Sequence, residues 1–313
     1  MNEKMKPIKR VAIYGSRSQE GYLDLLLDFI DSLAGNGITV TVERKLAKTL
    51  QDAGFKLNLH GASTCVELPE ETDAVISAGG DGTFLRSARW IGTREVPIIG
   101  INTGHLGFLA ENSIEDLHDL PRRLANGEGR LEERFVLEVD ADGMPENVSR
   151  YALNDVAFLK GDTSSMINVG IRIDDNFLSD YRADGLIVAT PTGSTAYNLS
   201  VGGPIIVPTL KCMVLSPVAP HTLTLRPLVA GEDSIIVATV SSRASTYRLS
   251  IDGHSFSMPC GGEVRIKKAA HSVRVIRMPE ENFASTMRQK LLWGVEQSGT
   301  TGAETSPMAG SQT

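Results

Sequence analysis

Residues 74–83 read Ala74-Val75-Ile76-Ser77-Ala78-Gly79-Gly80-Asp81-Gly82-Thr83, and this stretch decides the fold. Its first half is a short apolar run typical of a buried strand, and its second half is a glycine-rich turn. The amphipathic residues 84–91 follow directly and predict a helix. A strand, a turn and a helix in this order place the turn at the carboxyl end of a strand, where a parallel sheet presents its ligands.

The chain on either side of this stretch alternates apolar runs with helix-like segments. Strands are predicted at residues 11–14, 38–42 and 96–101, and a helix at 22–33 ends at Gly35-Asn36-Gly37. Strands that alternate with helices imply a doubly wound parallel sheet. We therefore predict an α/β domain over residues 1–130 that carries the glycine-rich turn.

After residue 130 the pattern changes to short strand-like runs separated by turns, from residues 135–139 to 273–276. We predict a mostly β domain over residues 131–280. Residues 281–294 predict a helix that returns to the first domain. Residues 295–313 hold too few apolar side chains to offset the entropy cost of ordering, which predicts a disordered tail.

Composition excludes several classes of protein. The 313 residues are 41% hydrophobic, which suffices for a substantial core, and a net charge of -7 argues against binding nucleic acid or an acidic membrane by bulk electrostatics. The three scattered cysteines suggest neither a disulfide framework nor a zinc site. We find no signal-peptide pattern and no apolar run near the ~20 residues of a membrane span, so we expect a cytoplasmic protein.

The glycine-rich turn has the chemistry of a phosphate site. Free N–H groups at the start of a helix favour phosphate, and glycines let a ligand approach the backbone. Asp81 would repel a phosphate, so we expect it to face a sugar hydroxyl as hydrogen-bond acceptor or general base. Thr83 would serve the turn or a phosphate oxygen. The structural alternative is a tight turn with Asp81 as an ordinary helix N-cap.

A second dense stretch, residues 184–200, reads Asp184-Gly185-Leu186-Ile187-Val188-Ala189-Thr190-Pro191-Thr192-Gly193-Ser194-Thr195-Ala196-Tyr197-Asn198-Leu199-Ser200. It also runs from a strand through a polar turn to a helix-like segment. Its hydroxyl groups suit the lining of a polar pocket, with Tyr197 over a base or sugar. For this segment taken alone, a Ser/Thr-rich helix start with a buried Tyr197 is the better explanation.

Taken together, these segments resemble the NAD kinase family, and the resemblance runs from about residue 11 to 293. The Gly-Gly-Asp-Gly-Thr element alone also occurs in diacylglycerol, sphingosine and 6-phosphofructo kinases. The family is selected by the order of six elements: residues 79–83, 102–109 (Asn-Thr-Gly-His-Leu-Gly-Phe-Leu), 153–155 (Leu-Asn-Asp), 184–200, 220–228 (Pro-His-Thr-Leu-Thr-Leu-Arg-Pro-Leu) and 251–253 (Ile-Asp-Gly).

The resemblance implies an NAD kinase-like fold and transfer of the ATP γ-phosphate to the 2′-hydroxyl of the adenosine ribose of NAD, giving NADP and ADP. It implies that Asp81 is the catalytic base or orienting group. The residues it implies for the phosphate loop are Gly79, Gly80 and Thr83. Those it implies for the dinucleotide, bound mainly by the β domain, are Gly82, Phe108, Asn154, Asp155, Arg182, Asp184, Thr195, Ala196 and Tyr197. Asp155 stands where the family frequently has Glu, so its reach is shorter.

The same resemblance implies Mg²⁺ or another divalent cation carried by ATP, no resident metal site, and a homodimer or homotetramer.

Other interpretations stay open for single residues. The Asn154-Asp155 pair is also typical of a bend, Phe108 of a core position, and Asp184 of a turn. A lipid or sugar kinase would not need residues 190–197. A dinucleotide-dependent oxidoreductase is disfavoured because no Gly-x-Gly-x-x-Gly motif follows the first strand: residues 15–20 contain one glycine, Gly15. A non-catalytic module that senses NAD or NADP is the remaining alternative.

Overall fold

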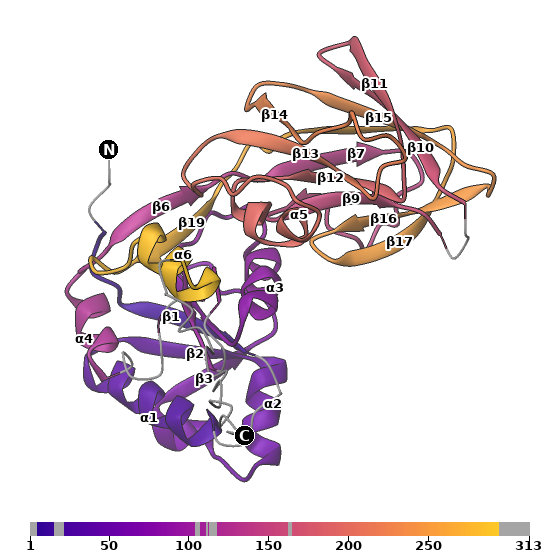
Figure 1. Cartoon of the computed structure of the whole chain (residues 1–313). Helices are drawn as coiled ribbons and strands as arrows, with labels where there is room; N and C mark the ends of the chain where they lie inside the picture. The colour runs from indigo at the N-terminus through magenta and orange to yellow at the C-terminus, as the bar shows by residue number, and fades with distance from the viewer. Residues whose placement is uncertain are drawn as a thin grey trace, which may run out of the picture.

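The computed structural model describes residues 5–15, 22–103, 107–110, 112, 118–161 and 165–293. The predicted tail at 295–313 lies outside the described residues, as do Gly104, His105 and Leu106 of the second matched element. The described chain forms an α/β part and a β part that lie side by side (Figure 1).

The α/β part is built on one seven-stranded sheet with the order β3-β2-β1-β4-β5-β19-β6. Neighbouring strands run parallel from β3 to β19, and β6 alone is antiparallel to its neighbour β19. The predicted parallel sheet is therefore confirmed. The strands are β1 (Arg10–Gly15), β2 (Thr39–Glu43), β3 (Ala62–Cys65), β4 (Ala74–Ala78), β5 (Ile98–Ile101), β6 (Arg130–Arg134) and β19 (Val273–Arg277).

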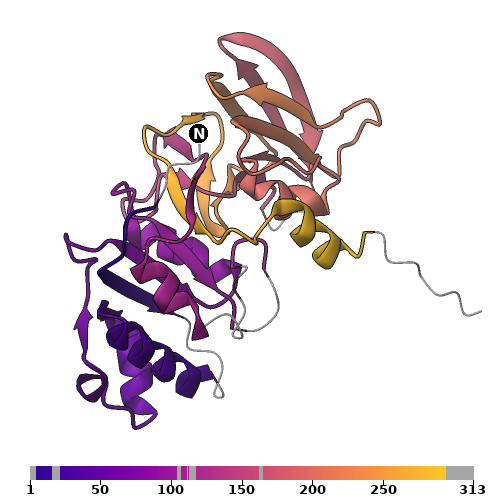
Figure 2. The ribbon, with the colours of Figure 1, turned by 90° about the vertical axis from the view of Figure 1, so that its left-hand side faces the viewer.

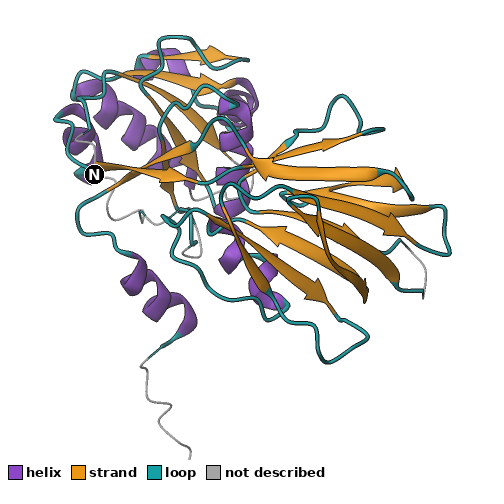
Figure 3. Cartoon of the chain, turned by 90° about the horizontal axis from the view of Figure 1, so that it is seen from above, coloured by secondary structure: helices purple, strands orange, loops and turns teal. Residues whose placement is uncertain are grey.

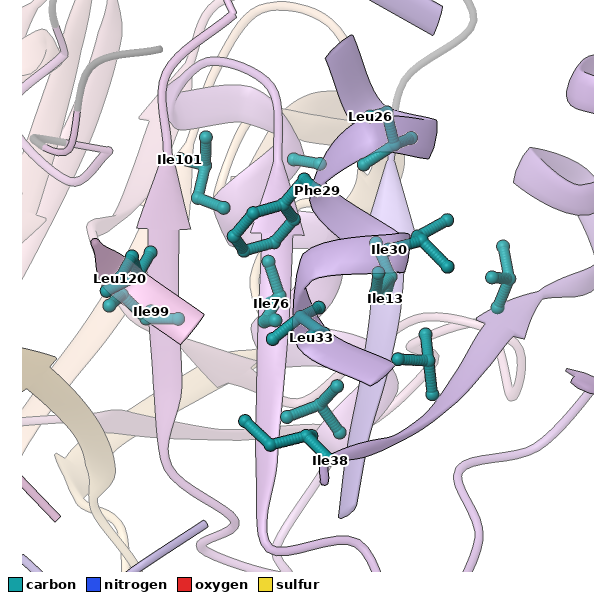
Figure 4. Packing of buried hydrophobic residues seen from close by; sticks show 14 of the residues in the cluster. Ile13, Leu26, Phe29, Ile30, Leu33, Ile38, Ile76, Ile99, Ile101 and Leu120 are labelled. Carbon is teal, nitrogen blue, oxygen red and sulfur yellow. The ribbon is translucent and has the colours of Figure 1, made fainter. Parts of the chain in front are cut away.

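Helices cover both faces of this sheet. Alternate strand residues point to opposite faces, and the residues on both faces are apolar and buried. Ile76 and Ile99 pack with α1 and α4 in one buried cluster (Figure 4), whereas Val75 and Ile98 pack with α3 in another. The sheet is thus doubly wound, as predicted. The helices are α1 (Tyr22–Gly35), α2 (Arg44–Asp52), α3 (Asp81–Ile91), α4 (Leu120–Ala125) and the 3₁₀ helix Leu57–His60.

The β part is a sandwich of two six-stranded antiparallel sheets, with orders β11-β10-β15-β18-β7-β8 and β14-β13-β12-β9-β16-β17. Phe158 of β9 and Val169 of β10 belong to different sheets but to the same buried cluster, so the sheets share one core. Seen from above, their strands lie in layers (Figure 3). This confirms the prediction of a mostly β C-terminal part.

The bounds of its strands are β7 (Leu137–Ala141), β8 (Tyr151–Ala152), β9 (Asp155–Leu159), β10 (Ile167–Ile173), β11 (Asn176–Ala183), β12 (Gly185–Ala189), β13 (Cys212–Val218), β14 (Leu228–Gly231), β15 (Ile236–Ser241), β16 (Thr246–Ile251), β17 (His254–Pro259) and β18 (Glu263–Lys268). A 3₁₀ helix, Thr192–Thr195, and α5 (Tyr197–Ser200) follow β12.

The chain passes between the two parts more than once. It leaves the first sheet after β6, builds the sandwich, and returns as β19 between β5 and β6. Helix α6 (Phe283–Leu291) then lies where the two parts meet (Figure 2). The domain boundaries at residues 130 and 280 stay a prediction.

Candidate functional site

The glycine-rich turn lies at the carboxyl end of β4, next to β1, where the strand order of the sheet reverses and ligands bind in such folds. Gly79 has φ +152°, and a Cβ there would lie 2.5 Å from the Thr83 Oγ1. Only glycine allows this close approach. Thr83 is buried against Gly79 of the turn, and its hydroxyl accepts a hydrogen bond from the Arg86 Nη2 at 2.9 Å. Gly80 and Gly82 are exposed.

Asp81 is the first residue of α3, and its carboxylate does not cap its own helix, whose N-cap is Gly80. It accepts N–H bonds from Phe108 at 2.9 Å, from Leu109 at 3.0 Å and from Ala110 at 3.3 Å. A Cβ on Gly107 would lie 1.9 Å from the Asp81 Oδ1. The N-cap alternative is therefore wrong, and the half-buried carboxylate instead ties the glycine-rich turn to residues 107–110.

A second aspartate makes the same kind of contact in the β part. The Asp252 carboxylate accepts N–H bonds from Leu153 at 2.9 Å, Asn154 at 2.7 Å and Asp155 at 3.2 Å. Asp252 (φ +47°) and Gly253 (φ +77°) form the two-residue turn between β16 and β17. Nothing in the sequence indicates that the Asp252 carboxylate reaches residues 153–155.

Residues 190–193 hold the same segment from the other side. The Thr190 N–H donates to the Asn154 carbonyl at 2.8 Å, and the Thr190 Oγ1 donates to the Leu153 carbonyl at 2.6 Å. A Cβ on Gly193 would lie 2.0 Å from the Asn154 carbonyl oxygen, so the two segments are in direct backbone contact. The Leu153-Asn154-Asp155 backbone is thus restrained on two sides.

A buried carboxyl group, that of Asp155, stands next to the half-buried carboxyl group of Asp252 here. Burial raises the pKa of Asp155 to about 7, and the charge of Asp252 adds to the rise. Burial also raises the pKa of Asp252, against the opposing effect of its three N–H donors and of Arg89 on α3. The Asp155 carboxyl group therefore changes between its protonated and ionised forms near neutral pH.

A pocket lies between the α/β part and the β part. It is lined by Phe108 and Leu109 of the α/β part, by Thr192 and Thr195 of the β part, and by Phe283 of α6. The pocket is also lined by a charged group that the sequence did not predict: Arg130, Glu132, Arg134, Arg277 and Glu281.

Arg134 is the most deeply buried member of this charged group, with 2% of its side chain exposed. Its guanidinium pairs with Glu132 at 2.5 Å and donates to the Thr192 Oγ1 at 3.4 Å. Residues 130–134 carry four charges in five positions, a pattern typical of an exposed strand, so no sequence signal indicates this burial.

Comparison with known proteins decides the family. Two family models, for the N-terminal and the C-terminal domain of ATP-NAD kinase, match residues 11–129 and 153–278. The chain belongs to the ATP-NAD kinase family.

Relatives and solved structures agree with this family. An NAD kinase of Porphyromonas gingivalis is 43% identical over 288 residues, and one of Bacteroides fragilis is 40% identical over 287 residues; each match covers 92% of this chain and 99% of the relative. Yeast NADH kinase in complex with NADH has a TM-score of 0.82 at 26% identity, covering 93% of this chain and 89% of that one. An Archaeoglobus fulgidus NAD kinase in complex with ATP has a TM-score of 0.68 at 27% identity, covering 89% and 98%.

The structure brings some predicted site residues of this ATP-NAD kinase family member together and not others. Asp81 contacts the turn that carries Phe108, Phe108 shares a cavity with Thr195, and residues 190–193 contact Asn154. Arg182 and Asp184 instead lie beyond the opposite end of β12, because Ala189 pairs with Asp155 whereas Gly185 pairs with Leu159. Five strand residues span roughly 16 Å.

In the rest of the 184–200 stretch, buried polar side chains hold the backbone in place, and the ring of Tyr197 is exposed. Asn198 is fully buried and bonds the Ser194 carbonyl and the Ser216 hydroxyl. Tyr197, which follows Ala196 at the start of α5, is 39% exposed, so the alternative of a buried tyrosine is wrong.

Within the ranges that the structure describes, no three His, Cys, Asp or Glu side chains are grouped so as to hold a metal ion. In the same ranges, no helix is long and apolar enough to cross a membrane.

Proposed function

We propose that this chain transfers the γ-phosphate of ATP to the 2′-hydroxyl of the adenosine ribose of NAD, releasing NADP and ADP, with Asp81 at the reacting centre. The observation that carries the proposal is the position of the Asp81 carboxylate: it lies on the glycine-rich turn and is bonded to the turn bearing Phe108. Relatives named NAD kinase, and related structures holding NADH or ATP, support both substrates.

The proposed reaction forms a bond between the 2′-oxygen and the γ-phosphorus while the bond from the γ-phosphorus to the β–γ bridging oxygen breaks. The exposed backbone at Gly80 and Gly82 offsets phosphate charge. The three N–H groups on Asp81 fix the direction of its carboxylate, so orientation of the hydroxyl is its main contribution. The hydroxyl proton passes to Asp81 during or after transfer and then to solvent.

The remaining predicted residues receive proposed roles around this centre. Phe108 packs on the adenine, Asn154 and Asp155 hold the dinucleotide, and the Thr195-Ala196-Tyr197 segment lines its site; Tyr197 has the exposed ring that such a contact needs. Mg²⁺ or another divalent cation enters on the phosphates of ATP, whose oxygens it prefers as ligands. The proposed location of the protein is the cytoplasm.

We also propose a homodimer or homotetramer in which Arg182 and Asp184 serve the dinucleotide site of a second copy, since they lie beyond the far end of β12 from Asn154. Exposed apolar side chains nearby support an interface: Phe177 is 66% exposed, and Leu223 is 88% exposed in the segment whose His221 N–H donates to the Arg182 carbonyl. Mixing inactive Asp81→Asn protein with inactive Arg182→Ala protein should restore activity. No recovery after subunit exchange would contradict a shared site.

The test of the function is an assay of purified protein with Mg-ATP and NAD, in which NADP is read by an NADP-specific dehydrogenase. We expect NADP and ADP in equal amounts. A lipid or sugar kinase would form no NADP, and a sensing module would bind NAD without consuming ATP. Either result would reject the proposal.

A further inference from the structure

The Asp252 carboxylate joins two segments that lie about a hundred positions apart in the chain. It accepts three consecutive N–H groups, of which that of Asn154 at 2.7 Å is the shortest bond. Hydrogen bonds to an ionised acceptor are about twice as strong as neutral ones. The hairpin turn of β16 and β17 therefore fixes the backbone of residues 153–155.

This restraint acts together with that of Thr190. Asp252 binds the N–H groups of the segment, and Thr190 binds the carbonyls of Leu153 and Asn154. With N–H and carbonyl groups both occupied, the direction in which the Asn154 side chain leaves the backbone is set. Ligand-binding groups need such support, because a small misplacement costs much of their effect.

We propose that Asp252 is a positioning residue for the dinucleotide: its carboxylate holds the Asn154 and Asp155 backbone so that these side chains meet NAD. This inference rests on the proposed function, since it takes NAD as the ligand of Asn154 and Asp155. Asp252 itself touches neither substrate.

The contact requires a carboxylate. Two carboxylate oxygens accept all three N–H groups, whereas an amide would turn an NH₂ donor toward at least one of them. The negative charge also faces the buried Asp155, and it contributes to the raised pKa of that residue. The other charged or titratable groups that line a pocket with Asp252 are Arg89 of α3, Tyr151 of β8 and His271.

The decisive variant is Asp252→Asn, measured by steady-state kinetics against wild type. We expect KM for NAD to rise about 10-fold, in line with loss of a charged hydrogen bond, while kcat and KM for ATP stay within about twofold. In the wild type, KM for NAD should fall as pH rises through about 7, as Asp155 becomes an acceptor for ribose hydroxyls. In Asp252→Asn this fall should move to lower pH, because the charge that opposes ionisation of Asp155 is gone.

Asp73→Asn is the matched control. The Asp73 carboxylate also binds two backbone N–H groups, those of Lys9 at 2.9 Å and Arg10 at 2.8 Å, but at the opposite end of the parallel strands. A purely structural role predicts that both variants lower Tm and leave KM for NAD unchanged. That result, or an unmoved pH profile in Asp252→Asn, would overturn the proposal.

A double-mutant cycle with Asn154→Ala checks that Asp252 acts through Asn154. In the Asn154→Ala background, Asp252→Asn should change KM for NAD by less than about twofold, and a full additive loss would contradict the coupling. If Asp252→Asn does not fold, Asp155→Asn carries the test: it should abolish the pH dependence of KM for NAD, and an unchanged profile overturns the inference. Failure of the proposed function is distinct, because the wild type would then form no NADP at all.

Discussion

Asp81 in the α/β part and Asp252 in the β part use the same local chemistry, since each carboxylate accepts three backbone N–H groups from a distant segment. Their surroundings differ. Both residues are half-buried, but Asp81 stands at the start of a helix beside two exposed glycines, whereas Asp252 stands in a hairpin turn next to the buried Asp155. The same contact therefore leaves one carboxylate open to substrate and makes the other a support for substrate-binding residues.

Outside the site residues themselves, the largest expected effects come from two glycines that pack against the two sites. An added Cβ at Gly107 meets the Asp81 carboxylate, and one at Gly193 meets the Asn154 carbonyl. Overpacking costs about 1–3 kcal/mol, which corresponds to about 5- to 160-fold in kcat/KM. Gly107→Ala should lower kcat, and Gly193→Ala should raise KM for NAD.

Gly35→Ala is the control for both glycine variants, because no atom lies within 4 Å of its Cβ position. Its kinetic constants should stay within about twofold of wild type. If Gly107→Ala and Gly193→Ala changed kcat by the same factor and KM for NAD by the same factor, the two sites would not differ in function.

A smaller effect concerns stability and pH on the Asp252 side. The pKa of Asp155 is about 7 in the folded protein against an ordinary value of 3.8, so the unfolded chain releases this proton at lower pH. The contribution of Asp155 to the free energy of unfolding is therefore lost as pH rises from about 4 to 7, and it is constant above that. The Tm of wild type relative to Asp155→Asn should fall over this range. If the Tm of wild type and of Asp155→Asn changed with pH in parallel, the raised pKa of Asp155 would be contradicted.

The smallest effect is expected on the Asp81 side. The Lys290 Nζ of α6 lies 5.2 Å from the centroid of the Phe108 ring. An exposed cation–π contact is worth about 0.5–1 kcal/mol, so Lys290→Met should lower Tm by about 2 °C with kcat unchanged. Lys290→Arg keeps the cation and should match wild type in differential scanning calorimetry. A fall in kcat for Lys290→Met would instead tie α6 to the reacting centre.

Much of the fold follows from local sequence patterns. The apolar run at residues 74–78 and the glycines after it predict a strand, a turn and a helix, which the structure contains as β4 and α3. The insertion of β19 between β5 and β6 has no local signal, because pairing between strands so far apart depends on the whole sheet.

The site was predictable only in part, for the same reason. Asp81 stands on a glycine-rich turn, and the family resemblance supplied a role for Asn154, but Asp252 was matched only as part of the element Ile251-Asp252-Gly253, with no role. Arg134 has the sequence context of an exposed strand and becomes buried only where the two parts meet. Contacts between distant segments create these features, so periodicity and motif spacing do not reveal them.

The central claim is that Asp81 acts on the reacting hydroxyl and not on the binding of NAD. Its most direct test is Asp81→Asn, shown folded by circular dichroism, in a single-turnover measurement of NADP formation alongside calorimetric titration with NAD. The account predicts a rate lower by about 10²–10⁴-fold, the usual contribution of a positioned acid or base, with the Kd for NAD within about threefold of wild type. A single-turnover rate equal to that of the wild type would contradict it.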